Sequence, residues 1–271
     1  MCFASLCFIA MHTFIKSVRG EVPIGVILWS QYAIQFALFS VLFAPRIPNM
    51  LSSGMMGLQI LRALMLLAAI CGFFIAVGLM QLADAIAIGF VAPLMITALS
   101  VVVLKEKVTS GHWVAIVVGF IGVLIIVQPG GGLFNWTALV PLGAAVAVAI
   151  YQTLTRPISQ SIGPTTMLFN ATLIGLVASS IALPFFWEAP DTEAMLYLLA
   201  AACLGSMAHF SLIKAYQWAP ASVVAPFSYI ELIYASALGF AVFGDIPDLP
   251  TLLGGAIIAA SGLYLIKRQR V

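Results

Sequence analysis

Gln81-Leu82-Ala83 begins a stretch of this chain that ends at Gly119-Phe120-Ile121-Gly122, and a similar stretch follows later. Gln217-Trp218-Ala219 begins the second stretch, which ends at Ser261-Gly262, about 136 to 140 residues further on. Both stretches are strongly apolar, and a short polar loop interrupts each of them. The chain therefore resembles two copies of one unit, and the relation between the copies decides the fold.

The polar loops of the two stretches carry opposite charge. Lys105 and Lys107 make the first loop basic, whereas Asp245 and Asp248 make its counterpart acidic. Basic loops favour the cytoplasmic side of a membrane, so we expect the two copies to cross the bilayer in opposite senses. Inverted repeats with a binding site between them are typical of secondary transporters. We predict a first repeat over residues 1–132 and a second, inverted repeat over residues 133–271.

The composition excludes a soluble fold. Of the 271 residues, 63% are hydrophobic and only 7% are charged, and the mean hydropathy is +1.16. Soluble domains carry about 25% charged residues. Because a membrane-spanning helix needs about 20 apolar residues, and proline and glycine mark the breaks, we predict an all-α integral membrane protein. Its ten helices are expected near 1–17, 23–44, 58–80, 83–104, 111–128, 136–155, 165–187, 194–217, 220–243 and 250–267.

The distribution of basic residues predicts the orientation. Ten crossings place both ends of the chain on one side of the membrane. The loops and tail of that side hold most of the basic residues, and Arg62 and Lys214 lie near helix ends there. The opposite side has only Lys16 and Arg19. The bias of basic residues toward one side predicts a multi-pass protein of a bacterial-type inner membrane with both termini cytoplasmic. The inner basic residues are Arg46, Lys105, Lys107, Arg156, Lys267, Arg268 and Arg270.

Several function classes are disfavoured by missing motifs. The sequence has no H-E-x-x-H or G-x-S-x-G motif, so we predict no enzyme activity and no catalytic residues. The four cysteines lie in apolar runs without metal-ligand spacing, which predicts free thiols, no metal site and no cofactor. A net charge of +2 without a basic surface argues against a nucleic-acid partner. Without a T-V-G-Y-G filter a channel is a weak alternative, and an intramembrane enzyme is weaker still.

Glu231 is the most informative polar residue, since it lies near the middle of the ninth predicted helix. Burying an ionisable side chain in the bilayer is costly, so such a residue marks a pathway, a proton site or a paired charge by default. Tyr234 and Ser228 share its helical face, and the neighbouring Tyr229 is a further candidate for substrate binding. The alternative is a neutral or paired carboxyl that braces two helices. Burial favours the protonated carboxyl, so proton coupling is a further possibility.

Other polar residues inside apolar runs are candidates for the same cavity. His209 lies in the eighth predicted helix, where it either contacts substrate or makes a helix–helix hydrogen bond. His12 and Lys16 share a face of the first helix, and Gln31 and Gln35 share a face of the second. Amides at that depth need partners, from another helix or from a substrate. Lys214 either extends to the inner interface or pairs with the ninth helix's glutamate.

Proline and glycine predict where helices bend and where they approach closely. Pro93 and Pro226 fall inside the fourth and ninth predicted helices, which hold corresponding places in the two halves. Proline removes a backbone donor, and transporters tolerate it near cavities. A kink there either lets the repeats move or serves packing alone. Gly122 and Gly254 are among the small residues that we expect at close helix contacts.

Short motifs cover nearly the whole chain. In the first half they are Arg62-Ala-Leu, Leu82-Ala-Asp-Ala85, Pro93-Leu, Leu104-Lys-Glu-Lys107, Trp113, Gly119-Phe-Ile-Gly-Val-Leu-Ile-Ile126 and Pro129-Gly130. In the second half they are Ala215-Tyr216, Ala219-Pro-Ala221, Ala225-Pro226, Tyr229-Ile-Glu-Leu232, Phe243-Gly-Asp245, Pro247-Asp248 and Ser261-Gly-Leu-Tyr264. These motifs resemble the drug/metabolite transporter (DMT) superfamily, and most closely its EamA-type, ten-helix branch. Many members have Gly-Glu where this chain has Gly244-Asp245.

The resemblance implies a secondary transporter that moves a small amphipathic metabolite by alternating access. Many relatives are exporters, so export of amino acids, aromatic ones included, is the leading expectation. Import of a cofactor-like metabolite such as S-adenosylmethionine or riboflavin is the alternative. Five plus five helices can enclose a cavity within one chain, which favours a monomer. The resemblance also implies that Glu106, in the motif of the first basic loop, caps or positions a helix end. The alternative is that Glu106 is a solvated charge in that loop.

Overall fold

The protein is entirely helical over the residues that its computed structural model describes, 1–18, 21–79, 82–128, 136–185, 187–244 and 249–269. In the first half the helices are α1 (Cys2–Val18), α2 (Ile24–Leu42), α3 (Ile47–Leu51), α4 (Met56–Leu79), α5 (Leu82–Gly89), α6 (Ala92–Val102) and α7 (Ser110–Val127). In the second half they are α8 (Leu139–Ser161), α9 (Pro164–Ala182), α10 (Thr192–Trp218), α11 (Ala221–Val224), α12 (Ile230–Leu238) and α13 (Leu249–Gln269). Short 3-10 turns and one π-helical turn complete these elements.

The lengths and compositions of these helices confirm the predicted membrane class. Six segments of the described chain are long and apolar enough to cross a bilayer, and four shorter helices are also apolar. With α5 and α6 counted as one crossing, the described segments supply the ten crossings that the sequence predicts. The four cysteines, Cys2, Cys7, Cys71 and Cys203, are free thiols, as expected.

The fourth and ninth crossings are broken rather than continuous. The fourth stops at Gly89 and resumes at Ala92, directly before Pro93. The ninth passes from α11 through a 3-10 turn (η5, Ala225–Tyr229) that contains Pro226, and α12 ends in a π-helical turn (Gly239–Phe243). Proline removes an intrahelical bond, which explains why both breaks coincide with it. The predicted kinks are therefore confirmed in the fourth and ninth crossings, which correspond in the two halves, although the two prolines are out of register.

The predicted bounds of two helices in the second half were wrong. The sixth was expected to end at residue 155, but α8 continues through Pro157 to Ser161. One proline costs a single intrahelical bond, which a membrane helix tolerates where neighbouring helices pack against it. The seventh was expected to reach residue 187, but α9 ends at Ala182 and a 3-10 turn at Leu183–Phe185 follows it. Pro184 explains the early stop, because it cannot donate to the helix.

Corresponding helices of the two halves pack against each other in opposite directions. Gly119 of α7 lies near Ser261 of α13, whereas Gly122, one turn further on, lies near Gly254. A Cβ atom placed on Gly122 would come within 2.9 Å of the Gly254 carbonyl oxygen, so glycine is required for this approach. The sequence numbers rise along α7 while they fall along α13. The two helices are therefore antiparallel.

The second and seventh crossings show the same relation. The Trp29 indole of α2 donates to the Ser180 hydroxyl of α9 over 3.0 Å. About two turns further along α2 and about three turns back along α9, the rings of Phe36 and Phe169 lie 5.4 Å apart. Residue numbers increase along α2 in the direction in which they decrease along α9, so this pair is also antiparallel. Two antiparallel pairs of corresponding helices are what inverted five-helix repeats require. The predicted boundary between the repeats, at residues 132 and 133, lies outside the described residues.

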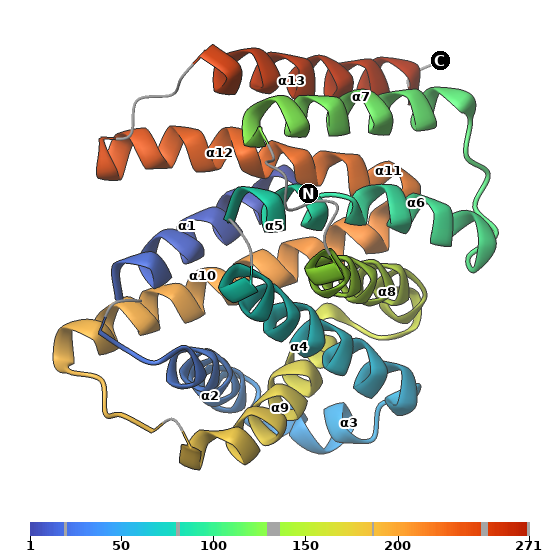
Figure 1. The fold of residues 1–271 in the computed structure, drawn as a ribbon. Coiled ribbons are helices and arrows are strands. Elements are labelled where there is room, and N and C mark those ends of the chain that lie inside the picture. The colour runs from blue at the N-terminus through green and yellow to red at the C-terminus, as the bar shows by residue number, and fades with distance from the viewer. Residues whose placement is uncertain (19–20, 80–81, 129–135, 186, 245–248, 270–271) are drawn as a thin grey trace.

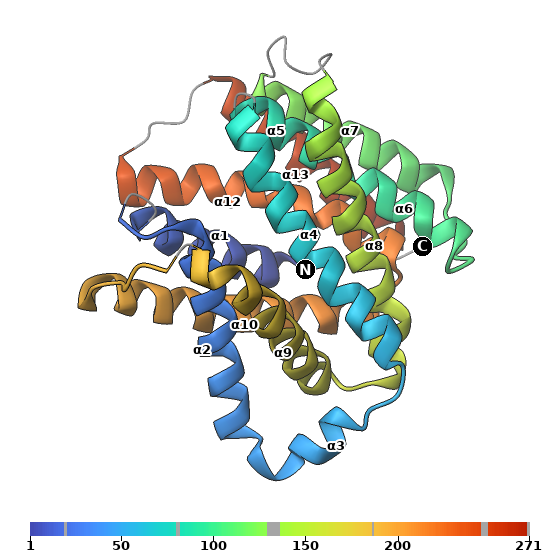
Figure 2. The ribbon, with the colours of Figure 1, turned by 60° about the horizontal axis from the view of Figure 1, so that its bottom comes forward.

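Two further contacts join helices that do not correspond, and the inverted symmetry makes these two contacts equivalent. The third crossing, α4, packs along the sixth, α8, and the eighth, α10, packs along the first, α1. Figure 2 shows α4 and α8 side by side. In Figure 1 the C-terminal ends of α6 and α13 lie to the right, and the C-terminal end of α1 and the N-terminal end of α10 lie to the left. These are the ends that the charge distribution assigns to opposite sides of the membrane.

Candidate functional site

A polar pocket lies between helices of both halves. Its walls come from α2 and α4 of the first half and from α8, α9 and α10 of the second. The free space within it is about 20 Å³, which is room for about one or two water molecules and far below the range of about 300–1,000 Å³ for ligand sites. A cofactor-sized solute therefore needs the pocket to widen. The lining residues are Tyr32, Gln35, Arg62, Leu66, Tyr151, Leu168, Ala171, Thr172 and His209.

Arg62 is the only arginine or lysine among the described residues of the pocket wall, and α8 holds its side chain. Its Nε atom donates to the Thr155 hydroxyl over 2.8 Å, and its Nη2 atom donates to the Tyr151 hydroxyl over 3.2 Å. The guanidinium carbon also lies 4.6 Å from the centre of the Tyr151 ring, a cation–π contact. Only 3% of the Arg62 surface is exposed. These contacts fix a buried guanidinium at the edge of the pocket.

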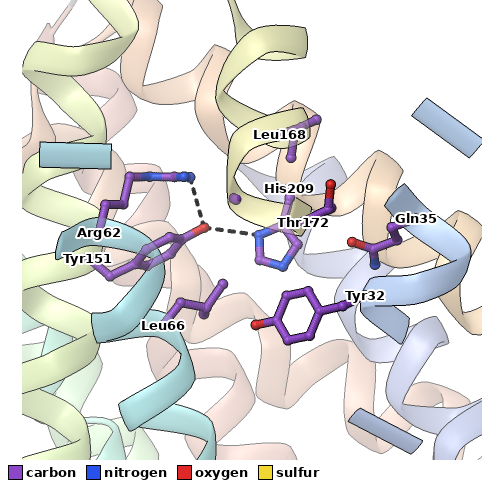
Figure 3. Close-up of a pocket in the computed structure, with 9 residues that line it drawn as sticks. Tyr32, Gln35, Arg62, Leu66, Tyr151, Leu168, Thr172 and His209 are labelled. Carbon is purple, nitrogen blue, oxygen red and sulfur yellow. Dashed lines mark hydrogen bonds between the residues drawn. The ribbon is translucent and has the colours of Figure 1, made fainter. Parts of the chain in front are cut away.

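Tyr151 links this guanidinium to a histidine of α10. The Tyr151 hydroxyl lies 3.0 Å from Nδ1 of His209, and Figure 3 shows it between Arg62 and His209. A guanidinium can only donate, so the Tyr151 oxygen accepts from Arg62, and we assign its hydrogen to the bond with Nδ1. The proton of a neutral His209 is then on Nε2. The network thus offers guanidinium and imidazole donors to whatever occupies the pocket.

Residues of α2 and α9 supply the other polar groups of the pocket. In Figure 3, Gln35 and Tyr32 lie across the view from Arg62 and Tyr151. Among the described residues, neither the Gln35 amide nor the Tyr32 hydroxyl has a hydrogen-bond partner, and neither is fully enclosed. Both groups are therefore available to water or to a solute. The Thr172 hydroxyl donates to the Phe169 carbonyl and keeps its acceptor sites.

The structure brings two of the predicted site residues, Gln35 and His209, to one pocket. Gln31 lies one turn from Gln35 and donates to the Leu198 carbonyl over 3.3 Å, so it serves the α2–α10 contact. Its amide oxygen is fully buried without a partner among the described residues. His12 and Lys16 lie on exposed positions of α1. None of these three lines the pocket, although α1 and α2 both pack on α10.

The predicted group around Glu231 lies elsewhere, between α1 and α12. The Glu231 carboxylate accepts from the Ser5 hydroxyl over 3.1 Å, and Ser5 is its one partner within the described part of the chain. Tyr234 is half-buried on the same helix. The alternative pairing with Lys214 is absent, since that ammonium lies 5.5 Å from the centre of the Trp218 ring. Glu231 is thus a half-buried carboxyl next to the first helix.

Tyr229 and Ser228, in the 3-10 turn before α12, face other neighbours. Tyr229 is fully buried against Val123 of α7 and Ile258 of α13. The Ser228 hydroxyl donates to the Ala225 carbonyl over 2.7 Å. The predicted common face of Ser228 with Glu231 assumed a continuous α-helix. Residues three apart eclipse in a 3-10 turn, so the change of helix type does not by itself separate the two side chains. The Ser228 hydroxyl bonds within its own turn, and the Glu231 carboxylate bonds to Ser5.

Glu106 holds the loop after α6 to the start of α11. Its carboxylate accepts from the backbone N–H of Ala221 over 2.8 Å and from that of Ser222 over 3.0 Å. The Ser222 hydroxyl donates to it over 2.8 Å. Backbone N–H groups at a helix start have no partner within the helix. Glu106 therefore caps a helix of the opposite half, as the motif implied, and is more than a solvated loop charge.

Arg156 of α8 binds the C-terminal end of α10, which directly precedes α11. It donates to the carbonyl oxygens of Tyr216 and Gln217, over 2.6 and 2.9 Å, at the end of α10. A cation at a helix C-terminus and an anion at a helix N-terminus both match the helix dipole. The corner between α10 and α11 is thus held from both halves.

A helical membrane bundle with antiparallel halves and a polar pocket at their seam has the architecture of a small-molecule transporter. The sequence profile of the EamA-like transporter family matches residues 1–128 and 135–267. The chain therefore belongs to the EamA-like transporter family, within the DMT superfamily. It is a multi-pass membrane protein of a bacterial transporter family.

Relatives of known name are transporters. The chain is 28% identical over 222 residues to the S-adenosylmethionine uptake transporter of Rickettsia bellii, covering 82% of this chain and 76% of that one. It is 36% identical over 182 residues to the riboflavin transporter of Vibrio cholerae, covering 66% of this chain and 61% of that one. A crystal structure with a TM-score of 0.86 and 16% identity covers 99% of this chain and shares its fold. These names do not support the expected amino-acid export.

Proposed function

We propose that this chain imports a cofactor-sized metabolite by alternating access through the seam between its halves. One observation carries the proposal: helices of both halves line a pocket with an arginine, a histidine and neutral polar groups, in a chain that is 63% hydrophobic. A site placed there opens to one side or the other when one half moves against its partner. The similarity to an S-adenosylmethionine uptake transporter and a riboflavin transporter supports import of such metabolites over export of amino acids.

The two helix breaks suit this movement. Both interrupt crossings at corresponding places, and a 3-10 or π-helical turn bends more readily than a continuous α-helix. The corner held by Glu106 and Arg156 would close one side of the seam. We place that side, with both termini, in the cytoplasm, because the loop after α6 is basic. One chain holds the whole pocket, which supports a monomer. Proton coupling through Glu231 remains part of the proposal.

Counterflow in proteoliposomes tests the proposal. Vesicles that contain the purified protein and unlabelled S-adenosylmethionine, riboflavin or an amino acid are placed in a trace of the same labelled solute. Saturable exchange of a cofactor-like solute is the expected result. Uptake that rises linearly without saturation would indicate a channel, and exchange of amino acids alone would restore the first expectation.

A matched pair of variants locates the pathway. Leu66→Trp fills the pocket wall, whereas Leu196→Trp adds the same bulk at a position of α10 that is 62% exposed. We expect the first variant to lose exchange and the second to keep it. Equal exchange by both would show that the solute takes another route.

A further inference from the structure

The charge on Arg62 is not balanced by a carboxylate. Its hydrogen-bond partners within the described chain are two hydroxyl groups, from Thr155 and Tyr151. The remaining contact is with the face of the Tyr151 ring. Among the described residues no acidic side chain lies within ion-pair distance of the guanidinium. A buried charge at membrane depth is costly, and it is kept where it has a function or a partner.

The Arg62 guanidinium has N–H donors that no protein acceptor within the described chain uses. Arginine carries five N–H donors, and Arg62 uses the one on Nε and one on Nη2. The other three have no protein acceptor within the described chain. Polar atoms that are both unpartnered and fully enclosed occur elsewhere, but Nη1 of Arg62 is not among them. Nη1, with two of these donors, is therefore not fully enclosed, and Arg62 lines the pocket.

We propose that Arg62 binds a carboxylate of the transported solute, with Tyr151 and His209 holding the guanidinium in place. A carboxylate accepts two parallel N–H bonds from a guanidinium, and this geometry is both strong and directional. Among the described residues the wall includes no second lysine or arginine, so its charge matches a single carboxylate group. A phosphate ester carries up to two negative charges and would leave one of them buried without a partner.

The assignment rests on the proposed import function and narrows its substrate class. S-adenosylmethionine carries a carboxylate together with an ammonium and a sulfonium group, whereas riboflavin carries no charged group. The other open groups of the pocket, the Gln35 amide and the Tyr32 hydroxyl, are neutral and suit the uncharged part of a solute. A solute with a carboxylate at one end and uncharged polar groups elsewhere is therefore the class that this pocket selects.

Two pairs of solutes, each differing by one charged group, test the assignment on the wild-type protein. Binding of S-adenosylmethionine and of its decarboxylated form is measured by calorimetry on protein in detergent micelles. We expect the form without a carboxylate to bind about 10- to 100-fold more weakly, the value of a hydrogen-bonded charge. Equal affinity, or no binding of either form, overturns the assignment. Tighter binding of riboflavin 5′-phosphate than of riboflavin would make this a phosphate site instead.

A substitution series ties the effect to the guanidinium. Arg62→Gln is expected to abolish the preference for the carboxylate form, and Arg62→Lys to retain part of it. The same change at an exposed arginine, Arg46→Gln, should leave the preference unchanged. A preference that survives in Arg62→Gln overturns the assignment. If Arg62→Gln fails to fold, the wild-type comparison still decides.

Binding and transport separate the two proposals. If S-adenosylmethionine binds with the expected preference but no solute exchanges across vesicles, the carboxylate subsite stands and the import function falls. If riboflavin exchanges while the carboxylate pair shows no preference, import stands and the subsite falls.

Discussion

Replacing Glu106 with alanine is expected to loosen the seam between the halves on the side of the α6–α7 loop. The side chain accepts three hydrogen bonds from Ala221 and Ser222, at 2.8 to 3.0 Å. These bonds join a loop of the first half to a helix start of the second. Truncation leaves two backbone N–H groups at the start of α11 without their acceptor, and the Ser222 hydroxyl without its partner.

The structure sets the size of the effect. Loss of a side-chain cap costs about 0.5–2 kcal/mol, and the loss of one further hydrogen bond costs about 0.5–1.5 kcal/mol. The contact is half-exposed, so we expect about 1–3 kcal/mol in all. If the contact is made only when that side is closed, the population open to that side rises about 5- to 150-fold.

The labelling rate of a cysteine in the pocket measures this population. Ala171→Cys is introduced in a chain whose four native cysteines are replaced, and a membrane-impermeant thiol reagent is added on the side of the α6–α7 loop. Glu106→Ala should accelerate labelling by the factor above. Lys107→Ala, a change at an exposed neighbour in the same loop, should not. Equal labelling rates in the two variants would refute the reasoning. Because residues in contact should be coupled, fully additive effects of Glu106→Ala and Ser222→Ala on the labelling rate would also refute it.

Three further changes test separate parts of the structure. Gly122→Ala places a Cβ atom within 2.9 Å of a backbone oxygen of α13, so we expect a loss of about 1–3 kcal/mol of stability. In the control Gly143→Ala the added Cβ atom meets nothing within 4 Å, so this variant should keep the melting temperature of the wild-type protein. Tyr151→Phe removes the hydroxyl between the guanidinium and the imidazole and should raise the KM for transport about tenfold, whereas Tyr197→Phe should leave it unchanged. Glu231→Gln should abolish any dependence of uptake on a pH gradient while counterflow continues; an unaltered dependence would end the case for proton coupling there.

The architecture was predictable because apolar runs and prolines carry the signal for membrane helices. Ten crossings, their breaks at Pro93 and Pro226 and the opposed direction of the halves all follow from hydropathy, proline chemistry and loop charge. The end of α8 did not, since a proline inside a helix stops it only where the surroundings fail to compensate. Pro157 lies within a helix that packs on α4 and α10.

The pocket was predictable only in part. Gln35 and His209 were found because polar groups in apolar runs need partners. Arg62 was missed, because a basic residue near a helix end is expected to extend toward the interface. In the structure α4 begins at Met56, more than one turn before Arg62, and Tyr151 and Thr155 of α8 cover the guanidinium. That contact joins residues 93 positions apart along the chain, and no local pattern encodes it.

The central claim is that a solute passes through the pocket at the seam and that the pocket opens to each side in turn. Labelling of the Ala171→Cys variant in sealed vesicles, with the impermeant reagent inside or outside, tests it most directly. The account predicts labelling from both sides and protection by a transported solute. Labelling from neither side, or from one side whatever solute is present, would contradict it.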